Sequence, residues 1–246
     1  MRNIKLTIRY DGTNYAGWQF QKNAVSIQET LQKAIKKVTG RKASVIASGR
    51  TDAGVHALAQ TANFRTPSKI PLKNLRMALN TILSDDIVIF GAEEVSLKFN
   101  AQKDAKSKVY RYTIYNRDFM DPLLRRYAAK CFFKLDEALM RKGAKYLVGR
   151  HDFTSFRTKD KEDGSASAVR NVRRIKIARN GDIVRVEIEA DGFLYNMVRN
   201  IIGTLIEVGR GKYPPQYVKE ILVKKDKRSC GPTAPAKGLC LVNVRY

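Results

Sequence analysis

The sequence predicts an α+β protein with two ferredoxin-like halves, each in the order β-α-β-β-α-β, arranged as a central antiparallel sheet around a cleft. Three observations support this class: short segments of alternating hydrophobicity, helical segments with recognisable caps, and the return of the same element order in the second half. The 246 residues also exceed the common single-domain size of roughly 100–150 residues. We therefore expect two subdomains, residues 1–100 and 101–246.

The first half opens with a strand at Ile4–Tyr10, in which every second residue is apolar. Ser26 and Glu29 form an S-x-x-E capping box, and the apolar residues that follow recur at helical spacing as far as Gly40. A helix is expected there. The remaining expected elements are strands at Ser44–Ala47, Thr61–Arg65 and Ile87–Val95, with a short helix at Leu72–Leu79 after Pro71.

The second half follows the same order more loosely, beginning with an alternating strand at Lys108–Tyr115. Asp136 is expected to cap the N-terminus of a helix that ends near Gly149. Asn180-Gly181 predicts a hairpin, because this dipeptide favours a tight turn between two strands. The other expected elements are strands at Val172–Ala178, Ile183–Ala190 and Leu239–Val244, a helix at Asn196–Val208, a shorter helix after Pro214-Pro215, and a mobile loop at Lys159–Ala168. We expect the two halves to join near residues 96–107.

The composition indicates a nucleic-acid partner. Lys and Arg number 47 against 23 Asp and Glu, which gives a formal charge of +24. Such a charge attracts polyanions and accelerates encounter with nucleic acid. A basic protein of the membrane surface would normally carry an amphipathic basic helix, whereas the expected helices have ordinary apolar stripes.

Several other classes lack their signatures. The three cysteines form no C-x-x-C pair, and no segment resembles a signal peptide or a membrane span. A cytoplasmic location is expected, with no membrane partner. Phosphate-loop and dinucleotide-binding sequences are missing, and the two histidines cannot supply a zinc deaminase site, so we expect no metal and no small-molecule cofactor. Catalysis would then depend on carboxylates, tyrosines and basic residues.

The densest group of candidate residues is the segment Ser48–Ala57, which lies between two expected strands. Small residues surround one carboxylate there, Asp52, and allow tight turns and a close approach by a ligand. Arg50 would favour the ionised form of Asp52, and Thr51 offers a hydroxyl. From the spacing alone, an Asp that only hydrogen-bonds its own turn remains the simpler interpretation.

Six segments resemble the family of tRNA pseudouridine synthase A. Ser48–Ala57 resembles the active-site sequence of that family, and five further segments follow in the family's order along the whole chain. These are Tyr10–Gln19, Val109–Tyr112, His151–Phe156, Asp191–Gly203 and Thr233–Leu239.

The resemblance implies the pseudouridine synthase fold, with an active-site cleft, and an enzyme that isomerises uridine to pseudouridine in the anticodon stem-loop of tRNA, at nucleotides 38–40. It also implies a homodimer that needs no cofactor. The catalytic aspartate would be Asp52, and attack on the base and attack on the sugar both remain open. The reacting uridine must leave its stack, and an aromatic surface must compensate for this. Tyr110 matches the substrate-stacking tyrosine of the family, although a strand position in the core is the alternative.

Arg199 is the second catalytic candidate. It interrupts an otherwise apolar helix, and an unpaired buried arginine would be strongly unfavourable, so we expect an anionic partner, Asp52. The resemblance implies the same pairing, because the corresponding arginine of the family faces the catalytic aspartate. The alternative is a surface arginine in contact with solvent or phosphate. Arg50 and Thr51 are expected to bind the substrate. Further candidate phosphate contacts are Lys22, Arg157 and Arg173-Arg174.

One segment departs from the family pattern. The family usually has Phe-His-Ala-Arg before the tyrosine strand, whereas this chain has Phe99-Asn100-Ala101-Gln102. The departure affects the expected RNA contacts more than the expected chemistry at Asp52. Two other classes compete with the enzyme interpretation: a non-catalytic RNA-binding protein, which the charge alone would explain, and a methyltransferase, which would need a glycine-rich cofactor turn.

Overall fold

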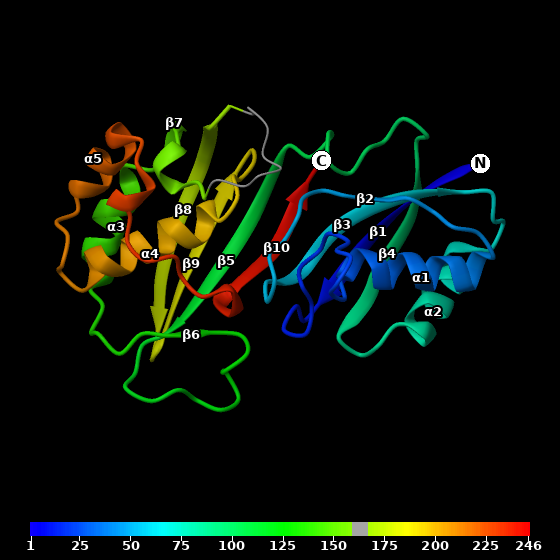
Figure 1. Ribbon diagram of the computed structural model, residues 1–246, viewed down its shortest axis with the longest axis horizontal. Helices are drawn as coiled ribbons and strands as arrows, with labels where there is room; N and C mark the ends of the chain where they lie inside the picture. The colour runs from blue at the N-terminus through cyan, green and yellow to red at the C-terminus, as the bar shows by residue number, and fades with distance from the viewer. Residues whose placement is uncertain (159–166) are drawn as a thin grey trace. The chain divides into compact units, whose positions relative to one another are not determined.

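The computed structural model describes residues 1–158 and 167–246, and its internal contacts divide the chain into two compact units (Figure 1). Unit 1 contains residues 1–106 and 240–246, and unit 2 contains residues 107–239. This division differs from the expected subdomains at both ends, because unit 1 continues to Lys106 and also includes the end of the chain. The expected loop at Lys159–Ala168 lies largely outside the described residues.

Unit 1 has the predicted order of elements. They are β1 (Arg2–Tyr10), α1 (Ile27–Thr39), β2 (Val45–Ala47), β3 (His56–Thr66), α2 (Leu72–Ile82), β4 (Ile87–Val95) and, at the end of the chain, β10 (Leu239–Arg245). The strands pair antiparallel in the order β4-β1-β3-β2, as expected for a ferredoxin-like half. β10 pairs in parallel with the first residues of β3.

The local sequence explains the first two elements of unit 1. Ile4, Leu6 and Ile8 of β1 are fully buried, which confirms the predicted apolar face. Ser26 caps α1 by accepting a hydrogen bond from the Glu29 backbone N–H, and the helix ends at a left-handed glycine. The Glu29 carboxylate lies 2.6 Å from Lys33, so the structure shows the Ser26 side of the capping box and an ion pair along the helix.

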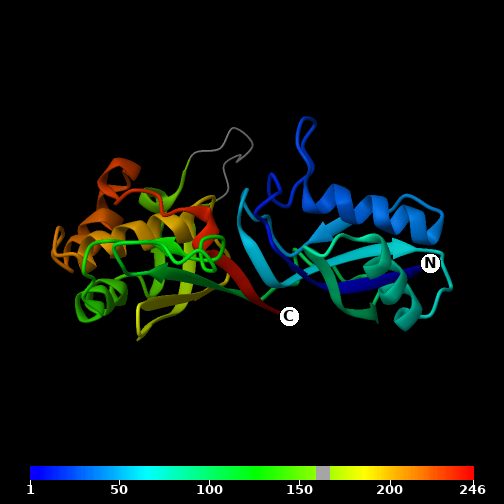
Figure 2. The ribbon, with the colours of Figure 1, turned by 90° about the horizontal axis from the view of Figure 1, so that it is seen from below.

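Unit 2 contains the remaining elements. They are β5 (Ser107–Tyr115), β6 (Ala129–Lys130), α3 (Glu137–Lys145), β7 (Gly149–Asp152), η1 (Thr154–Phe156), β8 (Val169–Asn180), β9 (Ile183–Ala190), α4 (Met197–Gly209), α5 (Tyr217–Lys224), η2 (Lys227–Ser229) and η3 (Ala236–Gly238). The antiparallel order is β5-β9-β8-β7, and β6 pairs in parallel with the end of β5. The helices α3, α4 and α5 pack together beside these strands (Figures 1 and 2).

The α+β class is confirmed, and most strands pair antiparallel as expected. The parallel pairs β3–β10 and β5–β6 make the strand pairing mixed. Alternation within one strand says nothing about the direction of its neighbour, so these two pairs could not be predicted. No helix in the described residues is both long and apolar enough to cross a bilayer.

Candidate active site

The Asp52 loop, residues 48–55, connects β2 to β3 and is fixed at its base by a buried hydrogen-bond network. The Ser48 hydroxyl donates to Oε1 of Gln60 (2.7 Å), and Nε2 of Gln60 donates to the Gly49 carbonyl (2.9 Å). The Thr51 hydroxyl lies 2.8 Å from the Tyr10 hydroxyl. Burial raises the pKa of Tyr10, so its hydroxyl stays protonated. The loop is therefore attached to β1 and β3 by neutral groups.

The segment from Gly12 to Trp18 packs directly against the other side of the Asp52 loop. The backbone N–H of Trp18 donates a hydrogen bond to the Thr51 carbonyl (2.9 Å). A Cβ atom on Gly12 would lie 2.0 Å from the Val55 carbonyl oxygen, and one on Gly17 would lie 2.5 Å from the Thr51 carbonyl oxygen. Gly17 also has a φ of 94°, which glycine adopts without strain. Only glycines allow the two backbones to approach this closely.

Within unit 1 the structure brings Arg50, Thr51 and Asp52 together on this loop. Arg50 is exposed and Asp52 is partly exposed, whereas Thr51 is buried and uses its hydroxyl on Tyr10. Thr51 therefore has a geometry suited to holding the loop rather than reaching RNA. Nδ1 of His56 accepts a hydrogen bond from the backbone N–H of Gly12 (3.1 Å), so this histidine helps to attach the Gly12–Trp18 segment to the start of β3.

Unit 2 carries Tyr110 and Arg199. Tyr110 lies on β5, is 7% exposed, and meets the ring of Phe193 edge-on with centroids 5.2 Å apart. Arg199 lies in the first turn of α4, a helix that is buried along most of its length, as predicted. Nε of Arg199 donates to the Ala234 carbonyl (2.8 Å), and Nη1 donates to Oδ1 of Asn196 (2.8 Å). These two neutral acceptors orient the guanidinium, and its predicted pairing with Asp52 remains a prediction.

The segment Thr233–Leu239 is held between α4 and β5. The Ala234 N–H donates to the Arg199 carbonyl (3.1 Å), and the Tyr112 hydroxyl donates to the Pro235 carbonyl (2.8 Å). A Cβ atom on Gly203 would lie 1.7 Å from the Pro232 carbonyl oxygen. The face of α4 that carries Arg199 and Gly203 thus contacts this segment and the residue before it, Pro232. The sequence did not reveal this contact.

The segment His151–Phe156 has a structural role. One oxygen of Asp152 accepts hydrogen bonds from the N–H (2.9 Å) and hydroxyl (2.6 Å) of Thr154, and the other lies 2.9 Å from Lys225. The Lys225 ammonium and the Thr154 hydroxyl lower the pKa of Asp152 to about 2. The Ser155 hydroxyl donates to the Ile221 carbonyl. These bonds attach η1 to α5.

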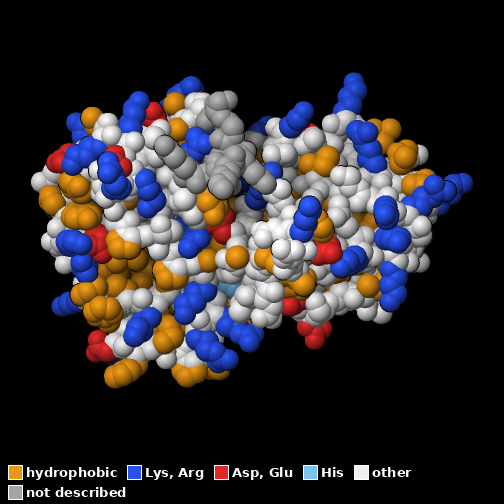
Figure 3. All heavy atoms as spheres, viewed as in Figure 1, with side chains coloured by type: hydrophobic (Ala, Val, Ile, Leu, Met, Phe, Trp, Pro, Cys, Tyr) orange, Lys and Arg blue, Asp and Glu red, His pale blue; other side chains and the backbone are white. Residues whose placement is uncertain are grey.

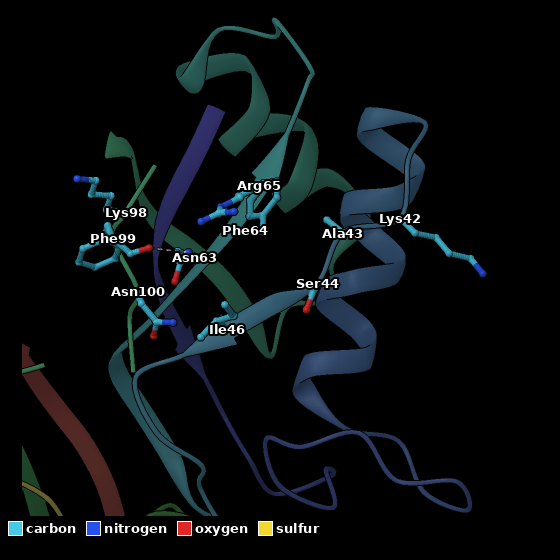
Figure 4. Close-up of a pocket in the computed structure, with 10 residues that line it drawn as sticks. All are labelled: Lys42, Ala43, Ser44, Ile46, Asn63, Phe64, Arg65, Lys98, Phe99 and Asn100. Carbon is cyan, nitrogen blue, oxygen red and sulfur yellow. Dashed lines mark hydrogen bonds between the residues drawn. The ribbon is translucent and has the colours of Figure 1, made fainter. Parts of the chain in front are cut away.

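The departure from the family pattern at residues 99–102 forms part of a pocket of about 380 Å³ in unit 1 (Figure 4). The side chains of Lys42 and Lys98 extend away from it on opposite sides, and Asn63 lies near its centre. Asn100 accepts hydrogen bonds from the N–H groups of Gln102 and Lys103 (3.0 Å each), so it stabilises a turn. Residues of the Asp52 loop do not line this pocket.

A partly exposed carboxylate on a loop that is braced from both sides, in a protein of charge +24, is an arrangement suited to an enzyme that acts on nucleic acid. The chain belongs to the tRNA pseudouridine synthase family, whose model matches residues 6–102 and 144–246. These ranges include Asp52 and Arg199 and leave out Tyr110. The chain is accordingly an isomerase of tRNA, and the alternatives of a non-catalytic RNA-binding protein and of a methyltransferase are set aside.

Full-length relatives support this assignment. The chain is 50% identical over 248 residues to tRNA pseudouridine synthase A of Thermoanaerobacter sp. (strain X514) and 48% identical over 246 residues to that of Acetivibrio thermocellus, with all of both chains covered in each case. It is 46% identical to tRNA pseudouridine synthase A 2 of Clostridium perfringens, again over both full lengths. A solved chain of a Cbf5-Nop10-Gar1 complex aligns with 97% of this chain over 58% of its own length, at 10% identity and with a TM-score of 0.39.

Proposed function

We propose that the protein converts uridine to pseudouridine at nucleotides 38–40 of tRNA, with Asp52 as the carboxylate that attacks the substrate. The observation that carries this proposal is the support of the Asp52 loop by Tyr10, Gln60 and the Gly12–Trp18 segment. A nucleophile must be held in position before its substrate arrives, because small misplacements lower the rate steeply. Both routes, attack on the sugar and attack on the base, satisfy this requirement.

The other candidate residues have separate tasks in this proposal. Tyr110 offers a ring that is held edge-on by Phe193 and can support an everted base. Arg199 keeps a fixed guanidinium and favours the ionised form of Asp52. Arg50, which is exposed, binds RNA phosphate. Thr51 contributes through the loop that it anchors.

The decisive experiment uses purified protein and unmodified tRNA in buffer with no added cofactor and with a chelator present. We expect pseudouridine to form in the anticodon stem-loop, and carbodiimide chemistry followed by primer extension would map its position. A requirement for an added metal or organic cofactor would contradict the proposal. If pseudouridine formed only outside the stem-loop, the proposed reaction would stand, but the proposed target nucleotides would be rejected. Because tRNA is the substrate, we propose the cytoplasm as the place of action.

We also propose a homodimer, and the long β5–β6 connection offers a contact surface for it. Two apolar side chains on this connection are largely exposed, Phe119 (86%) and Leu123 (85%), and a third, Phe132 (59%), follows shortly after β6. Figure 3 shows hydrophobic side chains along the edge of unit 2 where Figure 1 draws this connection. Large apolar side chains that are exposed close together along the chain are candidates for a protein–protein contact, and a second copy of the chain would cover them symmetrically.

Light scattering should give a mass of twice 27.9 kDa for the parent protein. The double variant Phe119→Ser/Leu123→Ser should shift the mass toward one chain, because it removes the apolar surface without touching the core. Val223→Ser is the matched control, since Val223 is 74% exposed on α5. A parent protein with the mass of one chain at working concentration would reject the dimer.

A further inference from the structure

The segment Asp191–Phe193, at one end of the unit 2 strands, lies next to several side chains from neighbouring strands. The Asp191 carboxylate accepts a hydrogen bond from the Asn171 N–H (3.0 Å), which attaches the segment to β8. A Cβ atom on Gly192 would lie 3.3 Å from Nε of Arg170, so the glycine leaves room for the arginine side chain. Phe193 supports Tyr110. The segment therefore places Arg170 and Tyr110 beside the same stretch of backbone.

Strand register adds Lys108 to this group. Lys108 pairs with Ala190, which also pairs with Val172 on the next strand. Directly paired residues lie on the same face of a sheet, and so do residues two apart on one strand. Lys108, Tyr110 and Arg170 therefore share one face of the sheet.

Within residues 1–158 and 167–246, the two cations of this group have no acidic partner. Lys108 is partly buried, and burial together with the positive charge of Arg170 lowers its pKa to about 8. Arg170 donates to the carbonyls of Ser167 (2.6 Å) and Val169 (2.7 Å), which are neutral acceptors. Across the described residues, neither side chain is paired with a carboxylate. Two like charges repel each other, and the partial burial of Lys108 strengthens this repulsion, so an anion that contacts both side chains would stabilise them.

We propose that Lys108 and Arg170 bind an RNA phosphate that flanks the uridine whose base lies against Tyr110. The inference rests on the function proposed above for Tyr110. A phosphate group satisfies both cations at once and accepts charge-assisted hydrogen bonds from each. The nucleotide chain also keeps this phosphate within reach of the everted base, so one contact fixes the backbone while the ring supports the base.

The first test is a binding cycle in the Asp52→Asn background, where turnover does not disturb the measurement. The RNA is the tRNA substrate, either unmodified or with one uncharged methylphosphonate linkage placed 5′ or 3′ to the target uridine. We expect Lys108→Gln to weaken binding of unmodified RNA roughly tenfold. One of the two methylphosphonates should weaken the parent similarly and should cause no further loss in Lys108→Gln. Additive losses, or unchanged affinity in Lys108→Gln, would overturn the proposal.

Two controls separate a phosphate contact from a structural lysine. Lys176→Gln removes one exposed positive charge from β8, on the opposite face of the same sheet, and should leave the methylphosphonate effect intact. Lys108→Met should melt at the same temperature as the parent or higher, because it removes a desolvated charge, and it should bind RNA as weakly as Lys108→Gln. A clear fall in melting temperature would instead assign Lys108 a structural role. Pseudouridine formation by the parent protein is scored separately, so failure of the proposed function and failure of the phosphate site remain distinguishable.

Discussion

Replacing Asp52 by Asn is expected to abolish pseudouridine formation while RNA binding stays within a few-fold of the parent. The substitution keeps the size of the side chain but removes the negative charge and the oxygen proposed to attack the substrate, and loss of a nucleophile lowers the rate by roughly four orders of magnitude or more. Removing an acid from a protein of charge +24 does not weaken its attraction for phosphate. Single-turnover assays with saturating protein would measure the chemical step, and filter binding would measure affinity.

Asp85→Asn is the matched control for this experiment. Asp85 lies in unit 1, is exposed, and stands outside the Asp52 loop, so this variant changes the net charge equally and should keep full activity. An active Asp52→Asn protein would reject the carboxylate mechanism. Loss of RNA binding together with activity would mean that Asp52 organises the binding surface instead of acting in the chemistry.

The second large effect is expected from Gly17→Ala. The new methyl group would lie 2.5 Å from the Thr51 carbonyl oxygen, far inside normal contact distance, so either the Asp52 loop or the Gly12–Trp18 segment must move. Displacement of a catalytic group by about 1 Å costs roughly 100-fold in rate. Gly12→Ala should behave similarly, because its Cβ would lie 2.0 Å from the Val55 carbonyl oxygen. Single-turnover rates and melting temperatures would be compared.

Gly40→Ala separates the contact with the loop from backbone strain. Gly40 has a φ of 73°, also in the left-handed region, but a Cβ atom there would meet nothing within 4 Å. We expect this variant to lose about 1–2 kcal/mol of stability from the left-handed backbone and to keep its catalytic rate. If Gly17→Ala kept the parental rate, the glycines would not determine the position of the Asp52 loop.

The local elements of the fold could be predicted from the sequence because their signals lie close together along the chain. Ser26 begins α1, Asp136 caps α3, and β8 and β9 form the predicted hairpin, in which Gly181-Asp182 makes the turn after the last β8 residue, Asn180. Each signal depends on backbone hydrogen bonds within a few residues, so distant contacts do not change it.

The start of β3 shows where local signals fail. A strand was expected at Thr61, yet β3 begins at His56, because Cys240 and Leu241 of β10 pair with His56 and Ala57. The pairing partner lies far away in the sequence, and the alternation of hydrophobic residues carries no information about it. In the same way, the contacts of residues 240–246 place the end of the chain in unit 1, whereas the alternation predicts only that a strand is present there.

By itself the sequence determined the α+β class, the order of elements and the basic charge, because composition and short-range periodicity encode these properties directly. Asp52 became the candidate carboxylate through the resemblance of Ser48–Ala57 to the family's active-site sequence, since the spacing alone favours an aspartate that only hydrogen-bonds its own turn. Only the tertiary structure decided how the Asp52 loop is held by Gly12, Gly17 and Tyr10, and which cations accompany Tyr110. These arrangements depend on strand register and on close contacts between segments far apart in the chain. They are set by packing of the whole fold, in which one added Cβ atom, or a shift of one residue in strand register, changes which side chains are in contact.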